Sequence, residues 1–121
     1  MLILPLAFLA VLAQEPAKNA EPDLAVISAR LGPCSADFTV TDAGGKGIYA
    51  ATVHVRIRYG FLGLKRMDLE VGTNGDGKAR VEGLPDEARP LTYDVTKGDK
   101  KTTVEQNVES HCEAKYEVTL K

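Results

Sequence analysis

VTDAGGKGIYAATVHVRIR, residues 40–58, is the stretch that decides the fold. From Ala51 onward its apolar residues alternate with polar ones at a period of two, which is typical of a strand with one buried and one solvated face. The glycine-rich run at residues 42–47 is typical of a turn. Alternation and turn recur in TNGDGKARVEGLP (residues 73–85) and LTYDVTKG (residues 91–98). This succession predicts an all-β fold, an antiparallel β-sandwich that occupies residues 24–121.

The first residues of the chain form an apolar run, MLILPLAFLAVLA, with no charged side chain before Glu15. This run is shorter than the roughly 20 residues of a bilayer span and suits the core of a signal peptide, although it lacks basic residues. Val11 and Ala13 are small enough for the −3 and −1 positions, so we predict a signal peptide over residues 1–13 and export to the periplasm or the medium. The alternative is a short hydrophobic strand or helix of the fold. Residues 14–23 are polar, contain two prolines and are predicted to be a flexible leader.

Length and charge restrict the class of protein. A chain of 121 residues with a formal net charge of −2 predicts one small domain. The near-neutral balance offers no concentrated basic surface, so nucleic-acid binding is not expected. No second long apolar run follows residue 13, so the mature chain is expected to have no transmembrane segment.

The chain has two cysteines, Cys34 and Cys112. An even count in a small exported domain favours a disulfide. Both residues fall on the apolar, inward-facing register of their predicted strands, which supports the pairing. The alternative is two buried free thiols, and no Cys-x-x-Cys spacing indicates a redox pair.

The C-terminal segment contains an ambiguous periodicity. Apolar residues recur every fourth position from Val104 to Leu120, as they would on one face of a helix. A spacing of four also keeps parity on a strand, and the β-branched content of the segment favours strands. We therefore predict a hairpin that turns near residues 109–111.

Residues 40–55 and residues 73–85 each combine a glycine-containing turn with apolar core positions that follow it. A short strand at residues 93–95 comes after them. The residues concerned are Val40, Asp42, Gly45, Ile48, Ala51, Val53 and Val55; Thr73, Asn74, Asp76, Gly77, Ala79, Val81, Gly83, Leu84 and Pro85; and Tyr93 and Val95. This pattern resembles that of carboxypeptidase regulatory-like domains, also called transthyretin-like or prealbumin-like sandwiches. The resemblance extends from about Cys34 to Leu120.

The resemblance implies an Ig-like Greek-key sandwich of seven or eight strands. It also implies an exported, non-enzymatic module that accompanies enzymes or receptors. Two features depart from the family pattern. Residues 89–93 lack the usual glycine, and residues 60–64 are more apolar than such a loop normally is.

No residues suggest a reaction centre, so we predict no catalytic residues and no enzymatic activity. Ser28, Ser35 and Ser110 occupy no recognisable nucleophile motif. The transthyretin-like hydrolase of purine catabolism shares the expected architecture, but its C-terminal Tyr-Arg-Gly-Ser signature is absent from this chain. Hydrolase activity is therefore the weakest of the functions considered.

Metal and cofactor sites are likewise not predicted. The segment at residues 74–77 superficially resembles a calcium loop but lacks the required ligand spacing, so a tight turn is expected. His54 lies beside Arg56 and Arg58, whose charge disfavours a cation. His111 would be a candidate ligand only if Cys112 were reduced.

The remaining feature is YGFLGLKR, residues 59–66, which joins apolar groups to a basic pair at a predicted strand end. An exposed apolar loop with a basic rim would suit a protein or carbohydrate partner, or a layer of lipid headgroups. The favoured alternative is that the segment folds back and caps the open end of the sandwich, because a small domain needs every apolar residue for its core. The candidate partner-binding residues are Tyr59, Phe61, Leu62, Leu64, Lys65 and Arg66.

Overall fold

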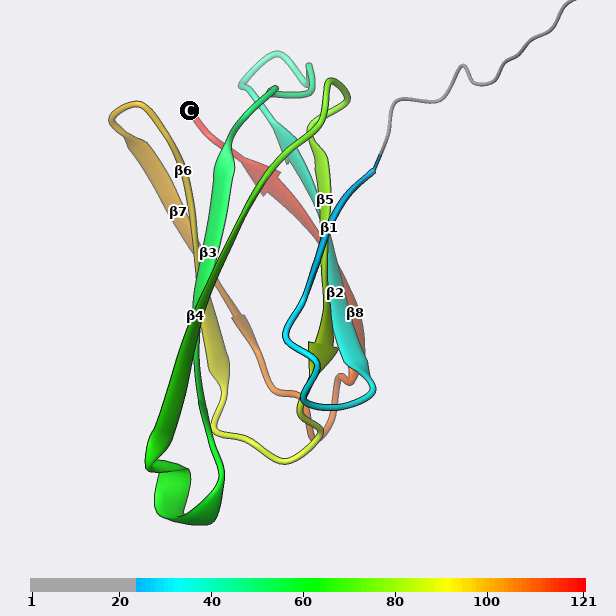
Figure 1. The fold of residues 1–121 in the computed structure, drawn as a ribbon. Coiled ribbons are helices and arrows are strands. Elements are labelled where there is room, and N and C mark those ends of the chain that lie inside the picture. Colours follow the sequence, from blue (N-terminus) through cyan, green and yellow to red (C-terminus); the bar gives the residue numbers. More distant parts are fainter. Residues whose placement is uncertain (1–23) are drawn as a thin grey trace, which may run out of the picture.

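Two four-stranded sheets pack face to face in the computed structural model, which describes residues 24–121 (Figure 1). The predicted all-β sandwich is confirmed, with eight strands. The predicted signal peptide at residues 1–13 and the predicted leader at residues 14–23 lie outside the described residues. Among residues 24–121 there is no helix long and apolar enough to cross a bilayer.

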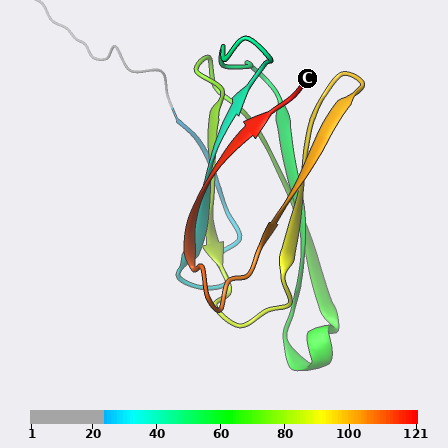
Figure 2. The same cartoon turned by 180° about the vertical axis from the view of Figure 1, so that it is seen from behind.

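The strands divide between the sheets out of sequence order. The first sheet has the order β1 (Ala25–Ser28), β5 (Lys78–Leu84), β2 (Cys34–Thr41) and β8 (Glu113–Thr119). The second has the order β4 (Lys65–Gly72), β3 (Thr52–Tyr59), β6 (Leu91–Lys97) and β7 (Lys100–Gln106). Figure 2 shows β8 at the edge of the first sheet, facing across to β7 on the second. The hairpins β3–β4 and β6–β7 stay within one sheet, whereas the β2–β3, β4–β5, β5–β6 and β7–β8 connections pass between sheets.

The sequence pattern predicts a purely antiparallel sandwich, but the sheets are mixed. β1 runs parallel to β5, and β2 runs parallel to β8. The predicted hairpin at residues 109–111 is also wrong, because β7 pairs with β6 and β8 pairs with β2. Parity and β-branched content identify strands, but they carry no information about which sheet each strand joins.

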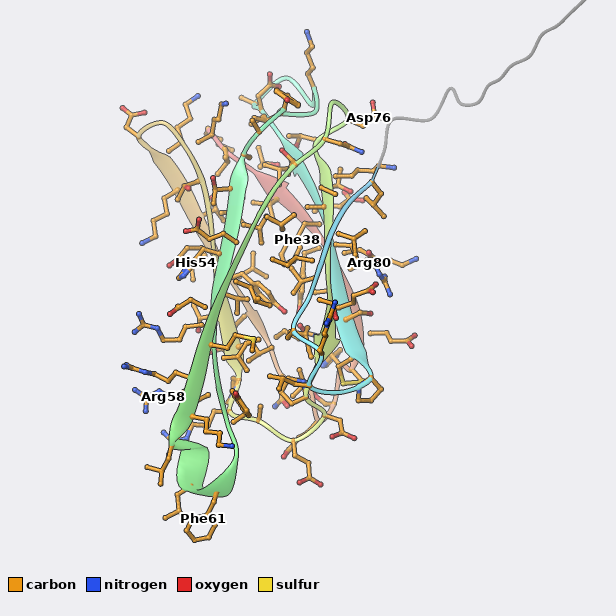
Figure 3. The ribbon with its side chains drawn as sticks, in the orientation of Figure 1. Phe38, His54, Arg58, Phe61, Asp76 and Arg80 are labelled. Atoms are coloured by element: carbon orange, nitrogen blue, oxygen red, sulfur yellow. A yellow bond between two sulfur atoms is a disulfide. The ribbon has the colours of Figure 1, made fainter. Side chains whose placement is uncertain are left out.

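The interior is formed by the inward-facing residues that the period-two pattern predicts. Val53, Val55 and Ile57 on β3 are fully buried, as are the residues on the matching face of β2. At the centre, Phe38 from one sheet meets Tyr93 from the other edge-to-face, with ring centroids 4.8 Å apart and an interplanar angle of 64°. Figure 3 shows Phe38 between the two layers.

A disulfide joins Cys34, at the start of β2, to Cys112, which precedes β8. The predicted pairing is therefore confirmed. The bridge closes a ring over a sequence separation of 78 and ties together the two parallel strands where they begin. A disulfide is compatible with an oxidising compartment.

The turn predicted at residues 74–77 is confirmed, although it passes between sheets. The Asn74 Oδ1 atom accepts hydrogen bonds from the backbone N–H groups of Asp76 and Lys78, at 2.9 and 3.0 Å. Gly77 has a φ of 79°, and a Cβ atom there would lie 2.2 Å from the carbonyl oxygen of Val40. Only glycine permits this conformation together with so close an approach.

Thr73, which precedes this turn, holds the connection between β2 and β3 in place, and its hydroxyl gives a testable prediction. Its Oγ1 accepts from the backbone N–H of Ala51 at 2.9 Å and donates to the carbonyl of Ile48. Thr73→Val keeps the shape but leaves a buried N–H unpaired, so the free energy of unfolding should fall by about 1–2 kcal/mol in urea titration. The control is Thr103→Val, which removes an exposed hydroxyl and should change it by less than about 0.5 kcal/mol. Equal losses in both variants would contradict the assigned role.

Candidate partner-binding tip

The five residues that connect β3 to β4, residues 60–64, form a projection that we call the tip. The ladder between the two strands ends at the pair Tyr59–Lys65. A short 3-10 helix, η2 (Phe61–Gly63), then closes the connection through hydrogen bonds from Gly63 N to Gly60 O (3.1 Å) and from Leu64 N to Phe61 O (3.2 Å). In Figures 1 and 2 the tip extends beyond the other loops at the same end of the sandwich.

The apolar side chains of the tip are exposed. Phe61 is 81% exposed, Leu62 71% and Leu64 76%. The expectation that this segment folds back to cap the sandwich is therefore wrong. The reason lies in the strand register: β6 pairs with β3 only as far as Val55, and the last part of β3 continues beside β4 alone. The hairpin overhangs the sandwich and carries the tip away from the core.

The backbone of the tip has an unusual feature at Leu62. Its φ of 57° and ψ of 19° lie in the left-handed region, between Gly60 and Gly63, whose φ values are 80° and 67°. Glycines adopt this region freely, but a leucine there costs on the order of 1 kcal/mol. The Leu62 side chain is exposed, so core packing does not compensate for this cost. Leu62 thus presents its apolar side chain to solvent.

Basic residues surround the base of the tip. Arg58 and Arg66 lie directly opposite each other at the end of the β3–β4 ladder, and both are exposed. The Lys65 side chain runs along the tip, with its Cδ 3.5 Å from the position that a Cβ on Gly60 would take. The Arg58 Cβ and the Arg89 Nε are each 3.9 Å from the Cβ position of Gly63. Like charges placed directly opposite each other are destabilising, so the sheet itself does not favour this arrangement.

These four basic residues differ from Arg56 and Arg80, each of which is paired with a carboxylate. Within residues 24–121, Arg58, Lys65, Arg66 and Arg89 form no ion pair. By contrast, the Arg56 Nε donates to Asp68 Oδ1 at 3.1 Å, and this hydrogen bond is the main reason that the pKa of Asp68 is lowered.

Arg80, on the other sheet, is neutralised in the same way. It donates to Asp37 and to Glu82, each at 2.9 Å, and both bonds raise its pKa, that to Glu82 the more. Figure 3 shows Arg80 on one layer and Arg58 and Phe61 at the far end of the other. Four basic residues without an ion pair among residues 24–121 therefore gather around the tip, while others, such as Lys97 and Lys100, lie elsewhere on the surface.

An open hollow of about 510 Å³ on the second sheet has Arg58 and Arg89 in its wall. It is lined by His54, Arg56, Arg58, Arg89, Pro90, Leu91, Thr92 and Asp94. The lining contains three arginines and one carboxylate, which already accepts a hydrogen bond from Thr103 at 3.2 Å. Because Arg56 is paired with Asp68, the unpaired positive charge of the hollow comes from Arg58 and Arg89, next to the tip.

Both histidines have local partners. His54 Nε2 lies 3.2 Å from Asp68 Oδ1, and His111 Nδ1 lies 2.9 Å from Ser110 Oγ. The sulfur of Cys112 is in the disulfide, so it is not a thiolate ligand next to His111. Residues 24–121 contain no group of three or more His, Cys, Asp or Glu residues that could hold a metal ion.

The structure brings most of the predicted loop residues together. Phe61, Leu62 and Leu64 form the apolar tip, and Lys65 and Arg66 lie at its base, whereas Tyr59 is half-buried against the core. Arg58 and Arg89 also belong to this surface, although the sequence pattern did not predict them there. Counting outward from the predicted turn would have placed Arg58 opposite Arg66. Arg89 comes from a separate loop and carries no local signal.

Neither a scan against protein-family models nor a search of curated proteins finds a match for this chain. The tip combines three exposed apolar side chains with four basic residues that form no ion pair within residues 24–121.

Proposed function

We propose that the protein is an exported, non-enzymatic β-sandwich that acts as an accessory or binding module and engages its partner through the tip. The observation that carries this proposal is the exposure of Phe61, Leu62 and Leu64 at the end of an overhanging hairpin. Apolar clusters at the surface of a small domain commonly mark interaction sites. The strained backbone at Leu62 supports the same interpretation.

We also propose that the sandwich is of the carboxypeptidase regulatory-like, transthyretin-like kind, with Greek-key connections. The residues that carry the resemblance support it by their local roles. Asp42 Oδ1 accepts from the N–H groups of Gly44 and Lys46 at 2.9 and 3.0 Å, as a turn aspartate should. Val53 and Val55 are buried at the matching core positions.

Export is supported by the Cys34–Cys112 disulfide together with the predicted signal peptide at residues 1–13. We expect the exported protein to begin at Gln14. Mass spectrometry of the secreted or periplasmic chain tests this, and an intact Met1 terminus on exported protein would contradict it.

The surroundings of the Ser110 hydroxyl support a non-catalytic role. Ser110 Oγ is within hydrogen-bond distance of His111 Nδ1. Within residues 24–121, however, that ring has no carboxylate partner to orient it as a general base. Both residues are exposed on a loop rather than enclosed in a cleft.

The proposed role of the tip predicts that stability and binding can be separated. Phe61→Ser with Leu62→Ser should leave the melting temperature within about 2 °C, because both side chains are already in solvent. Affinity capture from the native envelope or medium should lose its partner in this variant. Tyr49→Ser, at a residue that is 69% exposed elsewhere, is the matched control and should retain the partner. A large loss of stability, or equal capture by both variants, would contradict the proposal.

Carbohydrate or peptide binding is a second candidate, and the hollow beside the tip favours it. Its arginine-rich lining would suit an anionic peptide or sugar that packs against the apolar tip. Loss of binding in Arg56→Gln, with the Phe61 and Leu62 variant unaffected, would favour the hollow over the tip.

A further inference from the structure

We propose that the tip inserts into the interface of an anionic lipid bilayer, with Phe61, Leu62 and Leu64 among the acyl chains and the surrounding cations on lipid phosphates. This inference rests on the proposed binding role of the tip and names its partner. It follows from the order of apolar, basic and acidic side chains along the β3–β4 hairpin, starting from the tip.

The apolar part of the tip comes first. Phe61, Leu62 and Leu64 are exposed on a projection rather than in a groove, so no protein cleft is needed to accommodate them. β3 continues for four residues past its last pairing with β6, but Ile57 is buried and Tyr59 packs against the core, so the projecting part is the tip that follows Tyr59. Interfacial segments typically bury their apolar face only about 5–10 Å deep. Insertion at this depth needs the side chains of the tip alone, so the sandwich would stay in water.

The cations come next along the hairpin. Lys65, Arg66 and Arg58 occupy the last two rungs of the β3–β4 ladder, immediately behind the tip, and Arg89 lies beside Gly63. This places four unpaired basic groups at the depth where lipid phosphates would lie. Arginine and lysine near an anionic leaflet attract it electrostatically, and each makes a separate contribution.

Acidic residues lie farther back. Asp68 is the first carboxylate behind these cations on β4, and it is already engaged with Arg56 and His54. Asp86 and Glu87 belong to the loop between β5 and β6, which Figures 1 and 2 show set back from the tip. Repulsion by an anionic surface is thus weakest at the tip. An acidic polypeptide would find the same cations but would have no apolar layer for the exposed Phe61, Leu62 and Leu64, which favours the bilayer.

The chain contains no tryptophan, so a single one can report on the environment of the tip. We expect full-length Phe61→Trp to show a blue-shifted emission with vesicles of equimolar phosphatidylcholine and phosphatidylglycerol, and quenching by brominated acyl chains. Phosphatidylcholine vesicles alone should give a much weaker response. Tyr49→Trp, at an exposed residue of the connection that precedes β3, whereas the tip follows β3, is the control and should not shift.

Charge can be tested in the same vesicle assay. Arg58→Gln with Arg66→Gln should weaken partitioning to the anionic vesicles on the order of 25-fold, about fivefold for each charge removed. Lys97→Gln with Lys100→Gln is a matched control, since these residues also lie opposite each other at a hairpin end, remote from the tip. Partitioning of the parent should fall steeply as salt is raised. Both glutamine pairs are made in the full chain, so any lipid affinity of residues 1–13 is the same in each variant and does not affect the comparison.

The outcomes distinguish this inference from the proposed function. Unshifted Phe61→Trp emission with anionic vesicles, or equal partitioning of the two glutamine pairs, would overturn the membrane assignment. If polyglutamate or an envelope protein then still bound in a tip-dependent way, the tip would remain a binding surface for a different partner. If no binding depended on the tip, the proposed function would fail as well.

Discussion

Replacing Cys34 and Cys112 together with alanine is expected to lower the free energy of unfolding by about 4–5 kcal/mol. The bridge closes a ring over a sequence separation of 78, and the chain-entropy description of a disulfide gives roughly this value for a ring of that size. A small domain has about 5–15 kcal/mol of stability in total, so the loss would be a large part of it. Cys34 is fully buried, and truncating it removes core contacts in addition.

Urea titration of the oxidised chain and the double alanine variant measures this effect. The wild-type chain under dithiothreitol is the control that separates the bond from the side chains, and it should be destabilised nearly as much. A free-thiol titration of the denatured, unreduced protein should find no thiol. A loss below about 1 kcal/mol, or two titratable thiols, would contradict the assigned role of the bridge.

The features that follow from local periodicity were predictable from the sequence. The alternation around Val53 and Val55 identified the buried face of β3, and the same parity identified the facing sulfurs of Cys34 and Cys112. The turn at residues 74–77 was also predicted, because Asn and Gly at these positions have side-chain and backbone properties that need no tertiary partner.

The features that depend on pairing between distant strands were not predictable. The C-terminal strands were identified, but their partners were not, since parity is the same in a hairpin and in a crossover between sheets. The exposure of Phe61 was missed because it depends on how far β6 accompanies β3. Apolar composition alone favoured burial, and the register decided against it.

Gln106 is the clearest case of a residue whose role only the topology reveals. It lies in a polar stretch at the end of β7, yet it is fully buried. Its Oε1 accepts from the Tyr93 hydroxyl at 2.5 Å, and its Nε2 donates to the carbonyls of Ser35 (3.0 Å) and His111 (2.7 Å). These partners come from β6, β2 and the connection before β8, so one amide joins both sheets close to the disulfide.

Gln106→Leu should therefore lower the free energy of unfolding by about 3–4 kcal/mol. Leucine has a similar size, so the loss arises mainly from a buried hydroxyl and two carbonyl groups deprived of a partner. Burial also raises the pKa of Tyr93 well above its ordinary value, which keeps its hydroxyl protonated and in need of an acceptor. Glu105→Leu, at the exposed neighbouring position, is the control and should change stability by less than about 0.5 kcal/mol.

A double-mutant cycle with Tyr93→Phe tests whether the two side chains act together. Tyr93→Phe with Gln106→Leu removes the stranded hydroxyl, so the combined loss should be smaller than the sum of the single losses by at least about 1 kcal/mol. Amide hydrogen exchange should also quicken at residues 107–112 in Gln106→Leu, because the bond to the His111 carbonyl holds this connection. Additive losses with unchanged exchange would mean that Gln106 fills space beside Tyr93 and that other contacts hold the two sheets together at this end.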